Sequence, residues 1–496
     1  MKRNIPLAIK KIGVLFVLIL LSLMAAPFDS IAQEGTDWTF PVQIPGYDTD
    51  AEARIVADSS GTIHAFTNKL FEGELLVVYS KWIDGRGWTD PVDIFLPQLK
   101  SQSRVADVFL DDQGTFHLAF FSGDDQGAAY YYSKAHVTEA NQSTAWTNPV
   151  IIADQASTPA TSALIGDKAG NPLFLYHSDI AGNGLYAVHS LDRGDTWSGE
   201  PDLVFQTNGV ERWPSSLKVY IDDIGLIHAV WGMADVTGNS LAVFYSQVAA
   251  ANAGWKEPIV LDRADGFEAD TPAIIKYDGD LFVIYHNSFP TTRWMRRSSD
   301  DGATWSEPIK IFPKFQGTNG PASMIIDGNN ELRVFFGNRT NGAQTFGMWQ
   351  SIWDGNRWGI PEPVIAGDRV QDDQGGIGFD PSHAEARILN GNHMFLAWTT
   401  DPGAGRNGVW FSHKRLEIPP IPSILLPTVT AIPTATPEII PSPEPTRDPT
   451  GGLTDLDFTP PSQSPSLANG MLIGVGVSLI LLIFLLSFKL IVRSRS

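Results

Sequence analysis

Arginine residues recur at similar places along the chain, and arginine is the side chain best suited to grip a carboxylate through two parallel hydrogen bonds. In a chain with only 35 basic residues, this recurrence predicts a site for an acidic ligand. Glu52 and Glu385 precede two of these arginines by two residues, so structural ion pairs are the alternative interpretation. The segments are "AEARIVAD", "SQSRVAD", "VERWP" and "SHAEARIL", and their arginines are Arg54, Arg104, Arg212 and Arg387.

Aromatic and histidine side chains recur at a second set of places, mostly where apolar segments such as "LFLYHSD" and "LFVIYHN" end. Aromatic faces can pack on a sugar ring, which an acidic glycan would present together with its carboxylate. The alternative is that these side chains pack in the core. The candidates for glycan binding are Trp213, Trp231, Tyr176, His177 and His286.

These residues belong to a repeat of roughly 50 residues. Trp-x-x-Pro occurs six times from Trp38 to Trp358, and Trp197–Pro201 is a seventh copy with one extra residue. An aromatic-Ser or similar pair precedes most copies, and an Asx-Gly turn lies upstream of the pair. Each unit therefore predicts four antiparallel strands, A to D, which is the signature of a blade in an all-β β-propeller. We expect seven blades, with six as the alternative.

The last unit stops after its third strand and lacks its own Trp-x-x-Pro. The orphan first copy, residues 37–44, can supply the missing strand and close the ring, which removes exposed sheet edges. Because strand direction alternates, the A–B and C–D turns share one face. The starts of strands A and the ends of strands B share the other, around the mouth of the central channel. A ligand site is expected at that mouth, where several blades converge.

The phrase Ser-x-Asp-x-Gly-x-Thr-Trp occurs at Ser190–Trp197 and Ser298–Trp305. In the predicted blade it is the C–D hairpin. Its Asp and Ser can bond backbone amides, its Gly supplies an unusual φ, and its Trp packs between neighbouring blades. The phrase resembles the Asp-box of sialidases and related propellers, over residues 37–417. We interpret it as scaffold rather than as a reactive group.

The resemblance to sialidases also implies site residues. That family grips the substrate carboxylate with an arginine triad, and Arg54-Ile55 resembles the start of its Arg-Ile-Pro motif, although Val56 replaces the proline. Its nucleophile is a tyrosine activated by a glutamate, with an aspartate as acid and base. For these roles we select Tyr285 and Glu268, because both are expected to project from the fifth blade towards the mouth, and we add Asp270 as the further catalytic candidate. Sialidases have six blades, which is why six is the alternative here.

The two ends of the chain carry targeting signals. Residues 1–32 combine four basic residues, an apolar run and a small-x-small site, which predicts a cleaved signal peptide. Residues 418–466 are rich in Pro, Thr and Ser and predict an extended stalk. Residues 467–488 are apolar enough to span a bilayer, and the basic tail 489–496 predicts a cytoplasmic C-terminus. We therefore expect a single-pass membrane protein with an extracellular, monomeric ectodomain.

Composition excludes several function classes. A net charge of −20 argues against a nucleic-acid partner, and the absence of cysteine excludes disulfides and a thiol nucleophile. No motif predicts a metal site or a cofactor. Three functions stay open: a glycan-binding propeller with an acidic glycan or polysaccharide as ligand, an exo-α-sialidase or acidic-polysaccharide lyase, and a protein-interaction domain of the cell envelope. For the lyase, His177, His286 and Tyr285 would be the catalytic candidates.

Overall fold

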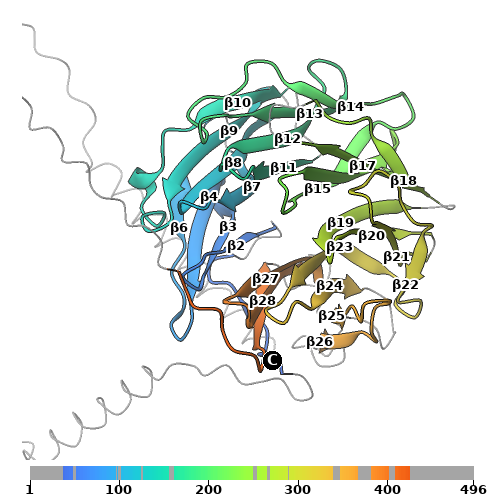
Figure 1. Cartoon of the computed structure of the whole chain (residues 1–496). Helices are drawn as coiled ribbons and strands as arrows, with labels where there is room; N and C mark the ends of the chain where they lie inside the picture. Colours follow the sequence, from blue (N-terminus) through green and yellow to red (C-terminus); the bar gives the residue numbers. More distant parts are fainter. Residues whose placement is uncertain are drawn as a thin grey trace, which may run out of the picture. The chain divides into compact units, whose positions relative to one another are not determined.

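The computed structural model forms a ring of β-sheets around a central channel (Figure 1). All described residues belong to one compact unit of the chain, Met1–Thr430. Among them no helix is long and apolar enough to cross a membrane. The predicted signal peptide, transmembrane segment and tail, and nearly all of the predicted stalk, lie outside them. The structure describes residues 37–47, 52–96, 98, 102–124, 127–155, 161–249, 254–264, 268–288, 290–338, 347–366, 381–400 and 408–424.

Seven antiparallel sheets are present, which confirms the all-β propeller and the count of seven blades. In blade 1 the outer strand is interrupted into β5 and β6, both paired with β4. A short 3-10 helix, η1 (Ser143–Ala145), lies in the C–D connection of blade 2. The strands of the first four blades are β2 (Arg54–Ala57), β3 (Thr62–Phe71), β4 (Glu74–Ile83), β5 (Gly87–Trp88) and β6 (Val92–Phe95); β7 (Ser103–Leu110), β8 (Thr115–Asp124), β9 (Gly127–His136) and β10 (Val150–Gln155); β11 (Ser162–Gly166), β12 (Pro172–Ser178), β13 (Gly184–His189) and β14 (Asp202–Gln206); β15 (Trp213–Ile221), β16 (Ile227–Ala234), β17 (Ser240–Val248) and β18 (Ile259–Arg263).

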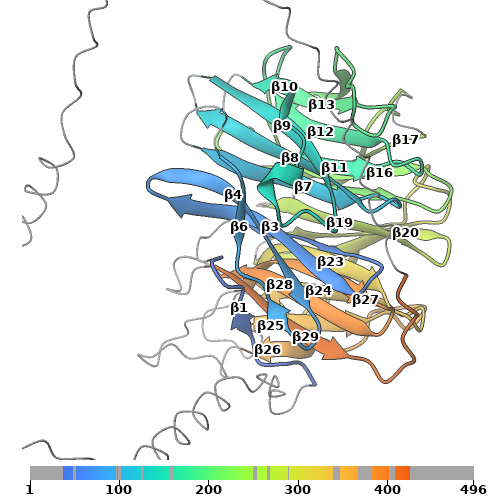
Figure 2. The same ribbon diagram turned by 90° about the vertical axis from the view of Figure 1, so that its left-hand side faces the viewer.

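The last blade takes its outer strand from the start of the chain, as the sequence predicts. Val42 pairs with Phe411 and Gln43 with Trp410, so β1 closes the ring against β29 (Figure 2). The strands of the last three blades are β19 (Ala269–Tyr277), β20 (Asp280–Asn287), β21 (Thr292–Ser298) and β22 (Ile309–Ile311); β23 (Thr318–Ile326), β24 (Leu332–Asn338), β25 (Gly347–Ile352) and β26 (Glu362–Ala366); β27 (Pro381–Leu389), β28 (His393–Thr400), β29 (Val409–Arg415) and β1 (Val42–Gln43).

The tryptophan of the outer strand packs on the preceding blade, which explains why it recurs. Trp38 of blade 7 meets Phe335 of blade 6 edge-on, and Trp146 of blade 2 meets Phe66 of blade 1. The Trp358 indole donates to the sulfur of Met295 across the same kind of boundary, at 3.2 Å. Each such ring removes a large apolar area from water at a blade boundary.

The serine of the Tyr-Ser pair ties strand C to strand D within a blade. Its hydroxyl donates to the carbonyl of the residue that follows the outer-strand tryptophan. The distance is 2.6 Å from Ser246 to Lys256, 2.9 Å from Ser351 to Gly359, and 2.7 Å from Ser412 to Thr39. The recurring Trp-x-x-Pro motif and the recurring aromatic-Ser pair are thus held together by one hydrogen bond. In blade 7 this bond joins the start of the chain to its last strand.

The Asp-boxes are C–D hairpins, as predicted, and their side chains satisfy their own turn. In the second box, Asp300 accepts from the Thr304 amide at 2.8 Å and from its hydroxyl at 2.6 Å. Ser298 accepts from the Gly302 amide at 2.8 Å. These bonds lower the pKa of Asp300 to about 2. Because Ser298, Asp300 and Thr304 are engaged in bonds within their own hairpin, the phrase is interpreted as scaffold.

Buried histidines near the A–B turns form a repeated motif that sequence reasoning missed. His228 lies 2.8 Å from the Tyr245 hydroxyl and 3.6 Å from Asp222, and the same Asp–His–Tyr arrangement occurs at His64 and His117. Burial lowers the pKa of all three histidines, so they are neutral structural links at ordinary pH. Their signal in the sequence was an Asp six residues before each His.

The glycine of an Asp-box sits against the tyrosine of the preceding blade and tests this packing. Gly302 has φ +83°, and a Cβ there would lie 2.0 Å from the Tyr245 hydroxyl. We expect Gly302→Ala to lower the free energy of unfolding by about 2 kcal/mol or more, through clash and left-handed strain. Urea denaturation of the purified protein measures it. Gly199→Ala is the matched control, because nothing lies within 4 Å of a Cβ there. Equal stability of the two variants would contradict this account of the Asp-box.

Candidate functional site

The inner strands of the seven blades place one residue each at the same level of the channel. The strand registers define this ring, since each member pairs with the equivalent residue of strand B. Four of these seven residues are charged and three have small side chains. The charged side chains extend into the space that the small ones leave free. The ring consists of Arg54, Asp107, Ala163, Lys218, Ala273, Ser323 and Glu385, and it lines a cavity of about 240 Å³.

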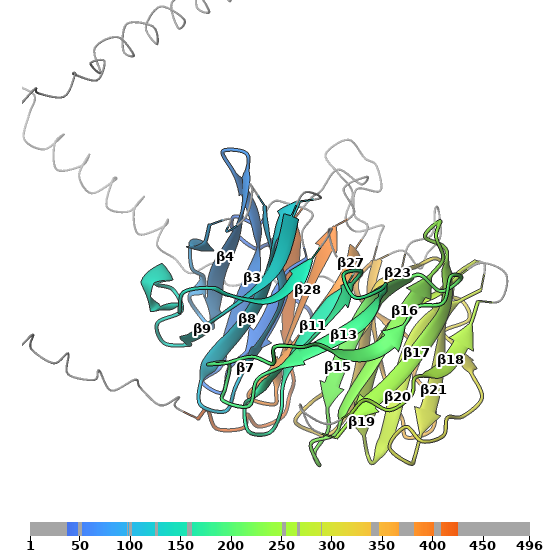
Figure 3. The same cartoon turned by 90° about the horizontal axis from the view of Figure 1, so that it is seen from above.

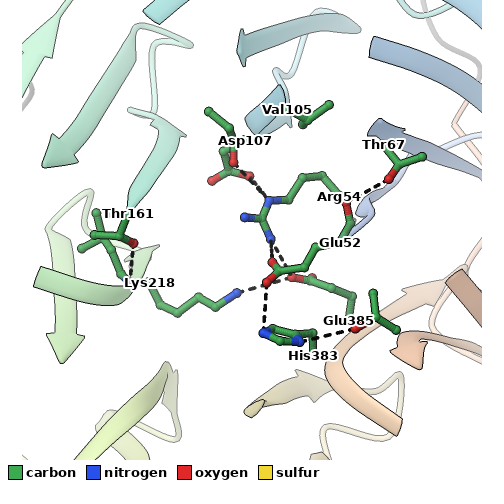
Figure 4. Close-up of polar contacts among 12 residues, drawn as sticks. Glu52, Arg54, Thr67, Val105, Asp107, Thr161, Lys218, His383 and Glu385 are labelled. Carbon is green, nitrogen blue, oxygen red and sulfur yellow. Dashed lines mark hydrogen bonds and ion pairs between the residues drawn. The ribbon is translucent and has the colours of Figure 1, made fainter. Parts of the chain in front are cut away.

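Three cations converge on the carboxylate of Glu385, and two of them, Arg54 and Lys218, are labelled in Figure 4. Arg387 Nη2 lies 3.2 Å from Glu385 Oε2, and Lys218 Nζ lies 3.4 Å from Oε1. Arg54 Nη1 lies 3.9 Å from the same Oε1. The three cations come from blades 7, 4 and 1, so the cluster exists only in the closed ring.

Two more carboxylates complete the cluster. Arg54 Nη1 donates to Glu52 at 2.9 Å, and Arg54 Nε lies 3.8 Å from Asp107. His383 Nε2 lies 3.0 Å from the second oxygen of Glu52. The predicted pairing of each arginine with its neighbouring glutamate is therefore confirmed for Glu52 with Arg54 and for Glu385 with Arg387, and the pairs merge into one network.

The pKa shifts follow from burial and from these partners. Burial opposes ionisation of Glu52, yet the Arg54 charge and the His383 contact hold its pKa well below the usual range. Burial likewise acts against Glu385, but Lys218, Arg387 and Arg54 keep its pKa low. Asp107 differs, because burial raises its pKa in spite of Arg54. Three cations thus face two firmly ionised carboxylates and a third that takes up a proton more readily.

Left-handed residues interrupt the inner strands near the mouth. Ser216, Thr271 and His383 have φ of 49°, 50° and 52°, and Gly320 has 65° at the corresponding place in blade 6. Each lies at an irregularity of the A–B register. Such bulges re-aim side chains and are costly for residues with a Cβ. In blade 7 the bulge turns His383 towards Glu52.

Of the four predicted carboxylate-binding arginines, the structure brings Arg54 and Arg387 together. Arg104 is exposed and donates to Gln102 at 3.3 Å. Arg212 is also exposed and lies over the Trp213 ring at 5.2 Å. The Trp213 ring meets His177 edge-on at 5.4 Å. Arg212, Trp213 and His177 therefore form a second group, at the boundary of blades 3 and 4.

The three residues selected for the sialidase-like roles contact other groups. Tyr285 is fully buried, and its hydroxyl donates to Asp262 of blade 4 at 2.8 Å, whereas Glu268 was the expected partner. Burial and the Asp262 charge raise the pKa of Tyr285. Asp270 accepts from Ser215 at 3.0 Å and from Ser240 at 2.9 Å. Burial and the nearby Asp270 charge raise the pKa of Glu268.

The other predicted residues lie inside blades. Trp231 is fully buried against Phe205 and Phe244. His286 contacts Thr271 Oγ1 at 3.0 Å, and burial lowers its pKa to about 4. Tyr176 is buried on one side and lines a pocket on the other.

Sequence reasoning missed Lys218 and Asp107. Neither belongs to a Glu-x-Arg pair like those at Arg54 and Arg387, and neither is an arginine, the residue type whose recurrence was followed. Their signal was positional, because both occupy the inward register that the repeat assigns to strand A.

Comparison with known proteins found distant structural similarity and no matching family. No protein-family model matches the chain, and no curated protein does. A protein of unknown function from Dyadobacter fermentans is 16% identical, with a TM-score of 0.47 over 76% of this chain and 98% of its own. An ulvan lyase bound to -[GlcA(1-4)Rha3S]- is 11% identical, with a TM-score of 0.47 over 75% and 95%. A Hadza microbial sialidase is 12% identical, with a TM-score of 0.41 over 69% and 73%.

Tyr285 and Tyr176 occupy equivalent positions in blades 5 and 3 and form a matched pair. We expect Tyr285→Phe to lower the free energy of unfolding by about 1–3 kcal/mol, because Asp262 loses a buried donor. Tyr176 has no hydrogen-bond partner among the described residues, so Tyr176→Phe should change stability by less than about 0.5 kcal/mol. Thermal and urea unfolding of both variants measure the difference. A larger loss in Tyr176→Phe would contradict the assignment.

Proposed function

We propose that this protein is a non-catalytic β-propeller that binds acidic glycans at the mouth of its central channel. The convergence of Arg54, Lys218 and Arg387 on one carboxylate carries the proposal. The carboxylate at that point is the chain's own Glu385. Its contacts with three cations from three blades support a site for a carboxylate of the kind that a uronic or sialic acid carries.

In this proposal Glu385 competes with the carboxylate of the ligand for the same three cations. In the free protein it neutralises cations that would otherwise repel each other in a confined space, and a ligand carboxylate would exchange with it. Because the contacts from Arg54 and Lys218 are long, 3.9 and 3.4 Å, the exchange sacrifices little hydrogen bonding.

The rim supplies a place for a sugar ring. Trp213 is half-buried, with the Arg212 guanidinium over it and His177 against its edge. An aromatic face with adjacent polar groups is suited to the apolar side of a pyranose. The hairpin between β3 and β4 projects beyond the neighbouring blades and adds exposed Leu70 and Phe71 (Figure 3).

Binding without turnover is favoured over hydrolysis by the placement of the candidate nucleophile. A sialidase-like reaction needs a tyrosine oxygen at the sugar, whereas the Tyr285 hydroxyl is buried against Asp262. Asp270 is equally engaged, with serine donors from blade 4. Neither group is poised for attack or proton transfer at the mouth.

We further propose that the propeller is exported and held on the outer face of a membrane by the segment 467–488. After the last strand the chain crosses the A–B turns of blades 7 and 1. The Ile421 amide donates to Asn390 and the Ile424 amide to Ser59, both at 2.8 Å. The chain thus leaves the face opposite the mouth, and a tether there would leave the mouth open to a ligand.

Removing the internal competitor should strengthen ligand binding. We expect Glu385→Gln to raise the affinity for sialyllactose or a uronate oligomer about tenfold, and Arg54→Met to lower it by a similar factor, since one charge-assisted contact contributes about 1.5 kcal/mol. Isothermal titration calorimetry at low salt measures both. Arg104→Met is the control, because that side chain lies outside the cluster, and its affinity should stay within twofold.

Two results would contradict the proposal. If neither Glu385→Gln nor Arg54→Met changes affinity while both change stability, the cluster is a structural ion network. If the wild-type protein releases 4-methylumbelliferone from its sialoside, or creates absorbance near 235 nm from a uronate polymer, the protein is a catalyst.

Membrane display has its own test. The full chain should sediment with membranes from producing cells, and a chain ending at residue 466 should be exported in soluble form, because the apolar span has been removed. Fractionation followed by immunoblotting measures this. Sedimentation of the truncated chain, or a soluble full-length chain, would rule the anchor out.

A further inference from the structure

A second pocket, separate from the charged ring of the channel, lies between blades 2 and 3. The strands that line it, β10, β12 and β13, can be followed in Figure 1. Its volume is about 560 Å³, within the range of small-molecule sites. One wall is the outer strand β10 of blade 2. The other is formed by β12, β13 and the Asp-box hairpin of blade 3, with the rings of Tyr176, Tyr186 and Trp197.

The equivalent place between blades 4 and 5 is filled. There Asp262 of β18 accepts from the Tyr285 hydroxyl at 2.8 Å and from Asn287 at 2.9 Å. Arg296 of β21 interacts with the same Tyr285 hydroxyl and donates to the Ser306 carbonyl of its own blade at 3.0 Å. An acid, a base and a phenol thus occupy the volume together.

The strand registers show what replaces these groups between blades 2 and 3. Asp262 pairs with Val243 as Ala153 pairs with Tyr130, so Ala153 stands in the place of Asp262. Arg296 pairs with Val283 as Val188 pairs with Phe174, so Val188 stands in the place of Arg296.

The tyrosine is retained, as Tyr176. Ala153 and Val188 stand where the other boundary has the charged side chains Asp262 and Arg296. The space that remains is a cavity, and the Tyr176 hydroxyl in its wall has no hydrogen-bond partner among the described residues.

The charges of the pocket select its ligand. Among the described residues that line it, Asp154 and Asp195 are acidic and none is basic. Asp195 is paired with Lys134 at 2.7 Å, and Asp154 is exposed at the rim. An anionic ligand would be repelled by Asp154 and find no cation in place of Arg296. Tyr176 offers a donor, Asp154 offers acceptors, and three aromatic rings offer apolar faces, which together suit a polyhydroxylated ring.

We propose that this pocket binds an uncharged sugar of one or two rings, independently of the acidic glycan at the mouth. The Tyr176 hydroxyl donates to a ring or hydroxyl oxygen of the sugar. Trp197 and Tyr186 pack on its apolar faces, and Asp154 accepts from its hydroxyls. The protein then has two carbohydrate sites of opposite charge preference on one propeller.

The test introduces into the pocket the aspartate and arginine that occupy the equivalent place between blades 4 and 5. Glucose, galactose, N-acetylglucosamine and maltose are offered to the full-length protein in detergent, and saturation-transfer NMR measures binding. We expect at least one to bind with a millimolar or tighter Kd. Ala153→Asp combined with Val188→Arg should abolish binding, because the new pair occupies the cavity. Tyr176→Phe should weaken binding about fivefold through loss of one hydrogen bond.

Thermal unfolding of each variant checks folding, and Tyr176→Phe keeps the test decisive if the double variant does not fold. The proposal is overturned if no probe binds at 50 mM, if binding is unchanged in a folded double variant and in Tyr176→Phe, or if glucuronate binds the pocket better than glucose. Glu385→Gln should leave the binding of these probes unchanged. The proposed mouth site and the proposed pocket site are therefore tested independently of each other.

Discussion

The contact between the outer-strand tryptophan of one blade and the strands of the preceding blade is the constraint on which the molecule depends. A four-stranded sheet of this size has two faces to bury and no covalent cross-link to help it, since the chain lacks cysteine. The indole of Trp38, Trp146 or Trp305 supplies much of that burial at its boundary. In blade 7 the indole comes from the opposite end of the chain, so the closure of the ring and the packing of its last boundary are the same event.

The closed ring has two faces that differ in their residues and backbone geometry. Turn residues with saturated hydrogen bonds, the Asx turns and the Asp-boxes, gather on one side, where Arg193 and Lys276 link turns of adjacent blades through Asp111 and Asp222. The other side receives the strand irregularities, with left-handed Ser216, Thr271 and His383. Backbone strain of this kind persists only where the surrounding structure enforces it. Among the residues that the structure describes, it lies next to a level of the channel at which charges from four blades meet.

Most of the fold could be predicted from the sequence because the motifs of one blade recur in all seven repeats. The Trp-x-x-Pro column, the missing last strand and its replacement by residues 37–44 all follow from the repeat. Arg54 and Arg387 were found because arginine recurs at the starts of the predicted strands A, and the glutamate two residues before each of them predicted its ion pair. Lys218 and Asp107 carry no such mark, and their partners lie in other blades, so no local pattern could connect them to Glu385. The partner of Tyr285 could not be predicted for a related reason: alternation predicts whether a strand residue points inward or outward, but not that its hydroxyl bonds Asp262 of the preceding sheet.

A repeat protein also contains its own controls, and these make the departures informative. Equivalent positions in different blades experience the same backbone and the same neighbouring sheet, so a change of side chain at one of them is close to a substitution experiment. Asp262 and Arg296 against Ala153 and Val188 is such a comparison, and the loss of two charged side chains with retention of the tyrosine converts a packed boundary into a lined cavity. The ring of Arg54, Asp107, Lys218 and Glu385 against Ala163, Ala273 and Ser323 is another. In both cases the propeller tolerates the change because the tryptophan contacts at each boundary, rather than these positions, hold the blades together.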